Sequence, residues 1–213
     1  MIKGVVFDLD GVLIESEPYF IKAEVEIFPR HGIPLTKVVA AEYLGLKLDD
    51  YINILEQRFH KSVNHAQVSA ELHKEIERVY EYDVPLVEHI SGVLDELQMT
   101  YKLALATSRE RHLAERVMKR LGIAKYFKHG LYREDVTKGK PDPEIYLKAA
   151  ALIGVEPTAC VAIEDAKMGF ESGKAAGMFV VGRKAAHNSI QDFSSANVTI
   201  EDMREIPRIL QAR

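Results

Sequence analysis

Short apolar segments recur along the chain and alternate with longer segments of helical periodicity. The apolar segments contain almost no polar residues, so they lack the alternation expected of a strand with one face in water. Strands of this kind are typical of a parallel sheet that is covered on both faces. They are predicted at residues 2–7, 103–106, 160–163 and 179–181, with a weaker one at 198–200.

Helical patterns separate most of these predicted strands. Leucine and valine recur at four-residue spacing over residues 109–121, which predicts a helix there. Further helices are predicted at 144–152, directly after an Asp-Pro pair, and at 166–176. Because strands alternate with helices, the chain is expected to form an α/β fold with an open, doubly wound, mainly parallel sheet.

One connection in this predicted sheet is far longer than the others. Between the first strand and the strand at 103–106 the sequence has helical patterns only, at about residues 18–31, 38–43, 48–60, 66–82 and 91–99. We predict an inserted helical cap domain over residues 15–84, and an α/β catalytic core formed by residues 1–14 and 85–213. Since ligands of open α/β sheets bind at the carboxyl ends of the strands, the cap is expected to lie over the site.

Composition narrows the class of partner. The chain has 213 residues, of which 47% are hydrophobic, and a formal net charge of −4. This charge disfavours nucleic acid, whose partners usually carry a basic stripe. No leader segment and no apolar run of membrane-spanning length is found, so we expect a cytoplasmic protein that binds no membrane. The lone cysteine, Cys160, is expected to be buried, and the scattered histidines are expected at the surface or in helix packing.

An acidic pair follows the first predicted strand. Asp8 and Asp10 are two residues apart, so both side chains can face the same side of an extended segment. Gly11 then permits a sharp turn and a close approach of the backbone to a ligand. By itself, however, Asp-x-Asp-Gly is as compatible with an ordinary turn as with a catalytic site.

Later segments add polar groups at the same edge of the predicted sheet. These groups are Thr107, Ser108 and Arg109 after the second strand, Lys140 before a helix, and Glu164 with Asp165 after the third strand. Each has an ordinary alternative as a helix cap or a solvated charge. Those alternatives do not explain why all the groups gather at one edge, which favours a catalytic site there.

In these motifs the chain resembles the haloacid dehalogenase-like superfamily, in the branch with a helical cap inserted after the first strand. The run Asp-Leu-Asp-Gly-Val-Leu that begins at Asp8 is similar to the first motif of that family, and Thr107 to the second. Lys140, in Gly-Lys-Pro-Asp-Pro, is similar to the third, and the pair Glu164-Asp165 to the fourth. The resemblance covers essentially the whole chain and implies a Mg²⁺-dependent phosphatase of a small phosphorylated metabolite.

The resemblance also implies roles for the acidic residues. Asp8 is expected to attack phosphorus and form an aspartyl-phosphate, while Asp10 acts as general acid and base. A carboxylate that attacks a phosphate dianion meets repulsion that a hard cation such as Mg²⁺ must offset. The expected metal ligands are Asp8, Asp165, the backbone carbonyl of Asp10, and Glu164 directly or through water.

Other residues are expected to bind the substrate. Lys140 would neutralise phosphoryl oxygens, and the Thr107 hydroxyl would donate a hydrogen bond to them. Further contacts with the substrate are predicted for Gly11, Ser108, Arg109 and Lys47. For the last two, an ordinary solvated side chain is the alternative.

Competing chemistries remain open at this point. A dehalogenase would need neither the second aspartate nor the acidic pair, which disfavours that reaction. A β-phosphoglucomutase-like mutase shares Asp10, but it has an arginine in the cap for the second phosphate, where this chain has Leu48 beside Lys47. Because an ammonium lacks the bidentate fork of arginine, we predict a phosphatase, with a mutase as the alternative. An inactive binding protein is disfavoured since every expected catalytic position is chemically competent.

Overall fold

A parallel sheet forms the centre of the computed structural model, which describes residues 1–46 and 48–213. Its six strands lie in the order β3-β2-β1-β4-β5-β6 and pair in parallel throughout. They are β1 (Gly4–Phe7), β2 (Lys102–Ala106), β3 (Gly130–Leu131), β4 (Cys160–Glu164), β5 (Phe179–Arg183) and β6 (Val198–Ile200). The direction of strand progression reverses at β1, and ligands of such sheets bind at the carboxyl ends beside that point.

The register of the sheet brings the predicted motifs to one edge. Phe7 lies opposite Leu105 of β2 and Ile163 of β4. The residues that follow these strands therefore leave the sheet side by side. All strands except β3 occupy predicted apolar segments. β3 was not predicted because a two-residue edge strand is too short to present an apolar run.

Helices cover both faces of the sheet, and this confirms the predicted α/β fold. The first face carries α5 (Ile90–Leu97), α6 (Arg111–Arg120) and α9 (Ile206–Gln211), and the second carries α7 (Glu144–Leu152) and α8 (Lys167–Ala175). Val5 and Phe7 pack into the first layer, whereas Val6 packs into the second. This double burial is why the strands have uninterrupted apolar sequences. Cys160 is a fully buried free thiol in the second layer, as predicted.

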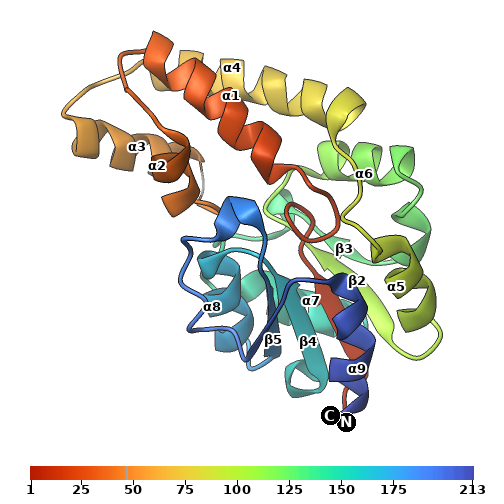
Figure 1. Cartoon of the computed structure of the whole chain (residues 1–213). Helices are drawn as coiled ribbons and strands as arrows, with labels where there is room; N and C mark the ends of the chain where they lie inside the picture. The colour runs from red at the N-terminus through yellow and green to blue at the C-terminus, as the bar shows by residue number, and fades with distance from the viewer. Residues whose placement is uncertain (47) are drawn as a thin grey trace.

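The connection from β1 to β2 forms the helical insertion. Its helices are α1 (Glu17–Arg30), α2 (Lys37–Glu42), α3 (Leu48–Phe59) and α4 (His65–Arg78). Figure 1 shows them at the end of the sheet opposite the two chain termini. They share an apolar core of their own that includes Phe28, Ile52 and Leu55. The insertion can therefore bury its apolar faces largely within itself.

The end of α4 departs from the prediction of one continuous helix. The α-helix stops at Arg78, and Val79–Asp83 form a π-helical turn. The Arg120 side chain donates hydrogen bonds to the carbonyl oxygens of Tyr80 at 2.8 Å and Val84 at 2.7 Å. These bonds satisfy backbone groups that a regular helix would pair internally. Across the residues that the structure describes, no helix is both long and apolar enough to span a bilayer.

Candidate active site

A buried lysine joins two of the predicted carboxylates. Asp8 directly follows β1, and its Oδ1 accepts a hydrogen bond from Lys140 Nζ at 2.5 Å. The same ammonium donates to Glu164 Oε1 at 2.5 Å and to the Ala106 carbonyl at 3.1 Å. Burial alone would lower the pKa of Lys140, but the two carboxylates raise it above its ordinary range. The ammonium therefore stays charged inside the protein.

Three carboxylates form a cluster at the carboxyl ends of β1 and β4. Oxygens of Asp8, Glu164 and Asp165 lie within 4.8 Å of one another, and all three side chains are buried. Burial raises the pKa of Asp8 well above its usual range against the opposing charge of Lys140, and burial also raises the pKa of Asp165. Carboxylates this close need more positive charge than one lysine supplies. Their all-oxygen donor set suits a hard divalent cation such as Mg²⁺.

Two glycines make the room that this cluster occupies. Gly11 has φ +70°, and a Cβ built on it would lie 1.9 Å from Asp165 Oδ2. A Cβ on Gly169 of α8 would lie 2.0 Å from the carboxyl carbon of Glu164. Any larger residue at either position would displace a carboxylate. Gly11 lies against Asp165 and is not among the described residues that line the pocket, and its contact with the substrate stays a prediction.

Glu164 is more fully hydrogen-bonded than the other two carboxylates. Its Oε1 accepts from Lys140 and from the Tyr146 hydroxyl at 2.5 Å, and its Oε2 accepts from the backbone N–H of Asp165 at 3.1 Å. These donors occupy most of its lone pairs. The arrangement favours contact with a cation through water over direct contact.

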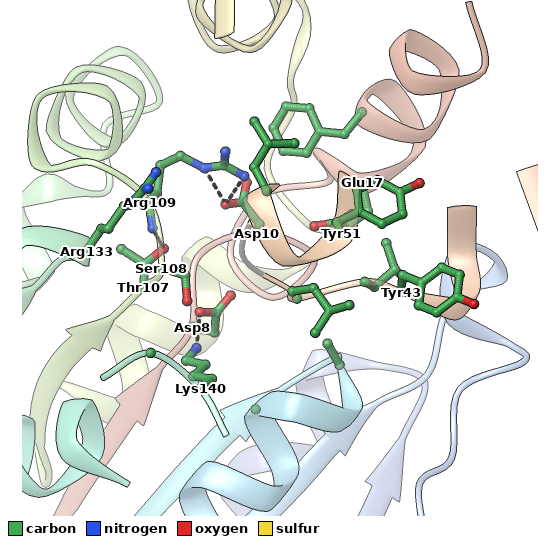
Figure 2. Close-up of a pocket in the computed structure, with 18 of the residues that line it drawn as sticks. Asp8, Asp10, Glu17, Tyr43, Tyr51, Thr107, Ser108, Arg109, Arg133 and Lys140 are labelled. Atoms are coloured by element: carbon green, nitrogen blue, oxygen red, sulfur yellow. Dashed lines mark hydrogen bonds and ion pairs between the residues drawn. The ribbon is translucent and has the colours of Figure 1, made fainter. Parts of the chain in front are cut away.

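Asp10 is held by three side chains. Its Oδ1 accepts hydrogen bonds from the hydroxyls of Ser16 and Tyr80. Its Oδ2 accepts from Arg109 Nε at 3.2 Å and Nη2 at 3.1 Å, the pair of dashed lines in Figure 2. The guanidinium also lies 4.8 Å from the centre of the Phe20 ring. Asp10 is therefore tied to the start of α1, the π-helical turn after α4 and the loop after β2.

The loop after β2 lines the pocket with three consecutive predicted residues, Thr107, Ser108 and Arg109. Thr107 Oγ1 accepts a hydrogen bond from the Arg109 backbone N–H at 3.1 Å. Helix α6 begins only at Arg111, two residues later than predicted, and Glu110 is its N-cap residue. Ser108 therefore does not cap this helix.

A buried histidine connects the carboxylate cluster to the start of the insertion. His187 Nε2 lies 2.9 Å from Asp165 Oδ2, and Nδ1 lies 3.3 Å from Glu15 Oε1. Burial would lower the pKa of His187, but its bonds to the two carboxylates raise it to about 9. Arg183 donates to Glu15 at 2.7 Å and to the Gly11 carbonyl at 2.6 Å. The prediction that the histidines lie at the surface or in helix packing is wrong for His187. The sequence around His187 gave no sign that it would contact Asp165 and Glu15.

The carboxylate cluster lies at the bottom of a cavity of about 330 Å³ between the sheet and the helical insertion. Figure 2 shows Arg109 and Arg133 on one side of this pocket and Glu17, Tyr43 and Tyr51 on the other. The Tyr51 hydroxyl donates to Glu24 Oε2 at 3.1 Å. Such a volume suits a small metabolite.

Glu17, Glu24 and Tyr51 of the insertion were not predicted as site residues. The available signal is that Glu17 and Glu24 are seven residues apart on α1, on the face that also holds buried Phe20. Two acidic residues on an otherwise apolar helix face are uncommon unless they serve a site.

Comparison with known proteins identifies the family. The family of haloacid dehalogenase-like hydrolases matches residues 5–183. The chain belongs to this family. The four motifs predicted a haloacid dehalogenase-like hydrolase, and this match confirms the prediction. The predicted α/β fold with a helical insertion is also confirmed.

Relatives of this haloacid dehalogenase-like hydrolase include both phosphatases and a mutase. A phosphorylated carbohydrates phosphatase of Thermotoga maritima is 32% identical over 180 residues, which cover 83% of this chain and 82% of that protein. A beta-phosphoglucomutase of Bacillus subtilis is 31% identical over 189 residues, which cover 84% and 82%. Among solved structures, a conserved haloacid dehalogenase-like protein of unknown function from Agrobacterium tumefaciens has a TM-score of 0.88. It is 24% identical over 100% of this chain and 99% of that one, so it shows the fold alone.

The cap loop of this haloacid dehalogenase-like hydrolase was predicted to contribute Lys47. That residue lies outside the described part of the chain. Its neighbour Leu48 starts α3 and lines the pocket. An apolar side chain thus stands at or near the position where the resemblance implies an arginine in the mutase.

Proposed function

We propose that this enzyme is a Mg²⁺-dependent phosphatase of a phosphorylated sugar or a similar small metabolite, and that it forms an aspartyl-phosphate on Asp8. One observation supports this most directly. Asp8 is buried, is held by Lys140, and lies beside Glu164 and Asp165 at the bottom of a cavity of metabolite size. The name of the Thermotoga relative, a phosphatase of phosphorylated carbohydrates, supports the substrate class.

The first half of the reaction uses residues of the core. Asp8 attacks phosphorus while Lys140 neutralises phosphoryl oxygens and keeps the Asp8 carboxylate in place. The Thr107 hydroxyl and Ser108 are positioned to donate hydrogen bonds to the same oxygens. Mg²⁺ would be held by Asp8, Asp165 and the Asp10 carbonyl, and Glu164 would contact it through water. Its positive charge would offset the repulsion between the Asp8 carboxylate and the phosphate.

Proton transfer is assigned to Asp10. In the first step it protonates the oxygen of the leaving alcohol, and in the second it accepts a proton from the water that attacks the aspartyl-phosphate. Its bonds to Ser16, Tyr80 and Arg109 fix the carboxyl group at the pocket. Since Ser16 and Tyr80 lie near the two ends of the insertion, we infer that movement of the insertion adjusts Asp10.

We also propose that residues 15–84 form the cap and that residues 1–14 and 85–213 form the catalytic core. The chain leaves and re-enters the core at neighbouring points. Ile14 forms an antiparallel bridge with Leu86, and the Glu15 backbone N–H donates to the Pro85 carbonyl at 3.0 Å. Two chain segments joined this closely act as a natural hinge between two bodies.

The mutase is the second candidate, because the Bacillus relative is a beta-phosphoglucomutase. A mutase must hold one phosphate of its substrate at the cap while a phosphoryl group is transferred at the nucleophilic aspartate. Leu48, at the pocket where the resemblance implies an arginine, offers no such contact. We therefore favour hydrolysis.

The proposal predicts Mg²⁺-dependent release of phosphate from p-nitrophenyl phosphate and from sugar phosphates. Removal of the metal with EDTA is expected to lower the rate by about 10²-fold or more, since an uncompensated cluster of carboxylates repels the dianion. Added Mg²⁺ should restore the rate. Isomerisation of β-glucose 1-phosphate is measured in parallel by glucose 6-phosphate formation. Rapid isomerisation with little phosphate release would overturn the preference for hydrolysis.

His187 is expected to position Asp165 for the metal. Replacing His187 with alanine should weaken Mg²⁺ binding by about 10- to 100-fold, because groups that orient metal ligands have effects of this size. The shift of the thermal midpoint during Mg²⁺ titration measures this affinity without reference to activity. His187→Gln keeps a donor toward Asp165 and should recover part of the loss, and His112→Ala, at an exposed position of α6, is the control. Unchanged affinity in His187→Ala would contradict this role.

A further inference from the structure

The loop between β5 and β6 reaches the helical insertion at the end of α2 (Figure 1). In this loop, the Gln191 side chain donates hydrogen bonds to the carbonyl oxygens of Ala41 at 2.7 Å and Glu42 at 3.2 Å. Both residues belong to the last turn of α2, and the carbonyl groups of a last turn have no partner within their own helix. Gln191 therefore supplies donors that the end of α2 needs.

The same side chain also binds the start of α8 in the core. Its Oε1 accepts a hydrogen bond from the Lys167 backbone N–H at 3.1 Å. Ala166, the N-cap residue of α8, has no side-chain oxygen that could accept such a bond. One amide group thus binds the ends of two helices, of which one lies in the insertion and the other in the core.

The loop that carries Gln191 is fixed to the core. The fully buried Asn188 donates hydrogen bonds to the backbone carbonyls of Asp165 at 2.8 Å and Arg183 at 2.9 Å. The Gln191 backbone N–H in turn donates to the Asn188 carbonyl at 2.9 Å. Gln191 is therefore held in place beside the end of β4, where the acidic cluster lies.

The part of the insertion that Gln191 binds lies over the active site. Residues 43–46 directly follow α2, and all four line the pocket. A Cβ built on Gly45 would lie 3.2 Å from the Ala166 Cβ, so this segment packs closely against the residue after Asp165. Movement of the end of α2 away from Gln191 would therefore open the pocket beside the acidic cluster.

We propose that Gln191 is a positioning residue that holds the cap closed over the active site. The inference goes beyond the proposed function, and it rests on the proposed division into cap and core. When the cap opens, the bonds to Ala41 and Glu42 break, whereas the bond to Lys167 stays. Only molecules with a closed cap bind a substrate fully, so the apparent affinity for a substrate depends on this link.

Gln191→Glu separates the two halves of the link. Glutamate keeps an oxygen that can accept from the Lys167 N–H, but its carboxylate donates no hydrogen bond to the carbonyls of α2. Hydrogen exchange with mass spectrometry measures cap opening without substrate. We expect exchange at residues 40–46 to be about 5- to 10-fold faster in this variant, since loss of a hydrogen bond shifts an equilibrium by about this factor. Exchange at Lys167 should stay as in the wild type.

Kinetics distinguish an effect on the cap from damage to the core. For Gln191→Glu, the KM for p-nitrophenyl phosphate should rise about 5- to 10-fold, because fewer molecules hold the cap closed. The inhibition constant of inorganic phosphate, which occupies only the phosphoryl position in the core, should stay unchanged. Gln211→Glu, at an exposed position at the end of α9, makes the same chemical change in the core and should alter neither exchange nor KM.

The outcomes separate this inference from the proposed function. Unchanged exchange at residues 40–46 in Gln191→Glu would overturn the inference, whatever the activity of the enzyme. A loss of Mg²⁺ affinity as large as that expected for His187→Ala would also overturn it, because Gln191 would then support the loop around Asp165 and not the cap. If exchange rises as expected but the wild type does not hydrolyse p-nitrophenyl phosphate, the proposed function fails and the role of Gln191 in cap closure is supported.

Discussion

Asp8→Asn is expected to abolish turnover and the aspartyl-phosphate together. An amide oxygen is a poor nucleophile and carries no charge, so the asparagine is not expected to attack phosphorus in place of the carboxylate. Loss of a nucleophile commonly lowers kcat by about 10⁴-fold or more. Phosphate release measures the turnover, and intact-mass spectrometry of acid-quenched enzyme measures the phosphorylated protein.

The Asp8→Asn result needs a folded protein and a matched control. Asparagine has nearly the same shape as aspartate. The circular dichroism spectrum of the variant, recorded without Mg²⁺, should therefore match that of the wild type. Asp95→Asn, at an exposed position of α5, makes the same chemical change away from the pocket and should keep wild-type turnover. Turnover by Asp8→Asn above the background of the assay would show that another group attacks phosphorus.

Lys140→Met is expected to lower both activity and stability. The change leaves Asp8 and Glu164 buried without their shared cation, and breaking a buried ion pair in this way costs about 3–5 kcal/mol of unfolding free energy. Activity should fall by about 10²-fold or more, because the phosphoryl oxygens lose a neutralising charge. Urea unfolding with and without Mg²⁺ measures the stability, and Mg²⁺ should restore part of it by supplying the missing positive charge.

Lys148→Met is the control for the lysine substitution. Lys148 lies on α7, and its side chain is 48% exposed although it pairs with Glu144. Exposed ion pairs contribute only about 0–1 kcal/mol, so this variant should stay close to the wild type in stability and activity. If Lys140→Met unfolds at the same urea concentration as Lys148→Met, then Lys140 does not hold the carboxylates together.

Much of the fold follows from local patterns in the sequence. The uninterrupted apolar runs predict parallel strands because each strand is buried on both faces, and helical periodicity predicts the elements between them. The helix predicted at residues 144–152 is an example of a correct local prediction, since α7 spans Glu144–Leu152. Not every helix start was accurate: α6 begins at Arg111, two residues after its predicted start.

The core of the candidate site also follows from the sequence. Asp8, Thr107, Glu164 and Asp165 each come directly after a predicted strand, and parallel strands that pair in register must end together. The motifs therefore lie close together because the strands that they follow end at the same edge of the sheet. Lys140 needed the resemblance as well, because it precedes a helix and no strand ends beside it.

Only the tertiary structure determined the partners of these residues. Asp10 contacts Tyr80 and Arg109, which are 70 and 99 positions away in the chain, and His187 reaches Asp165 across 22 positions. Local periodicity states which face of its own element a residue occupies, but not which distant element packs against that face. The sequence by itself thus determined the sheet, the helical insertion and the acidic edge. Packing of the insertion over that edge determined what surrounds Asp10 and which carboxylates face the substrate, because such contacts depend on how whole elements meet.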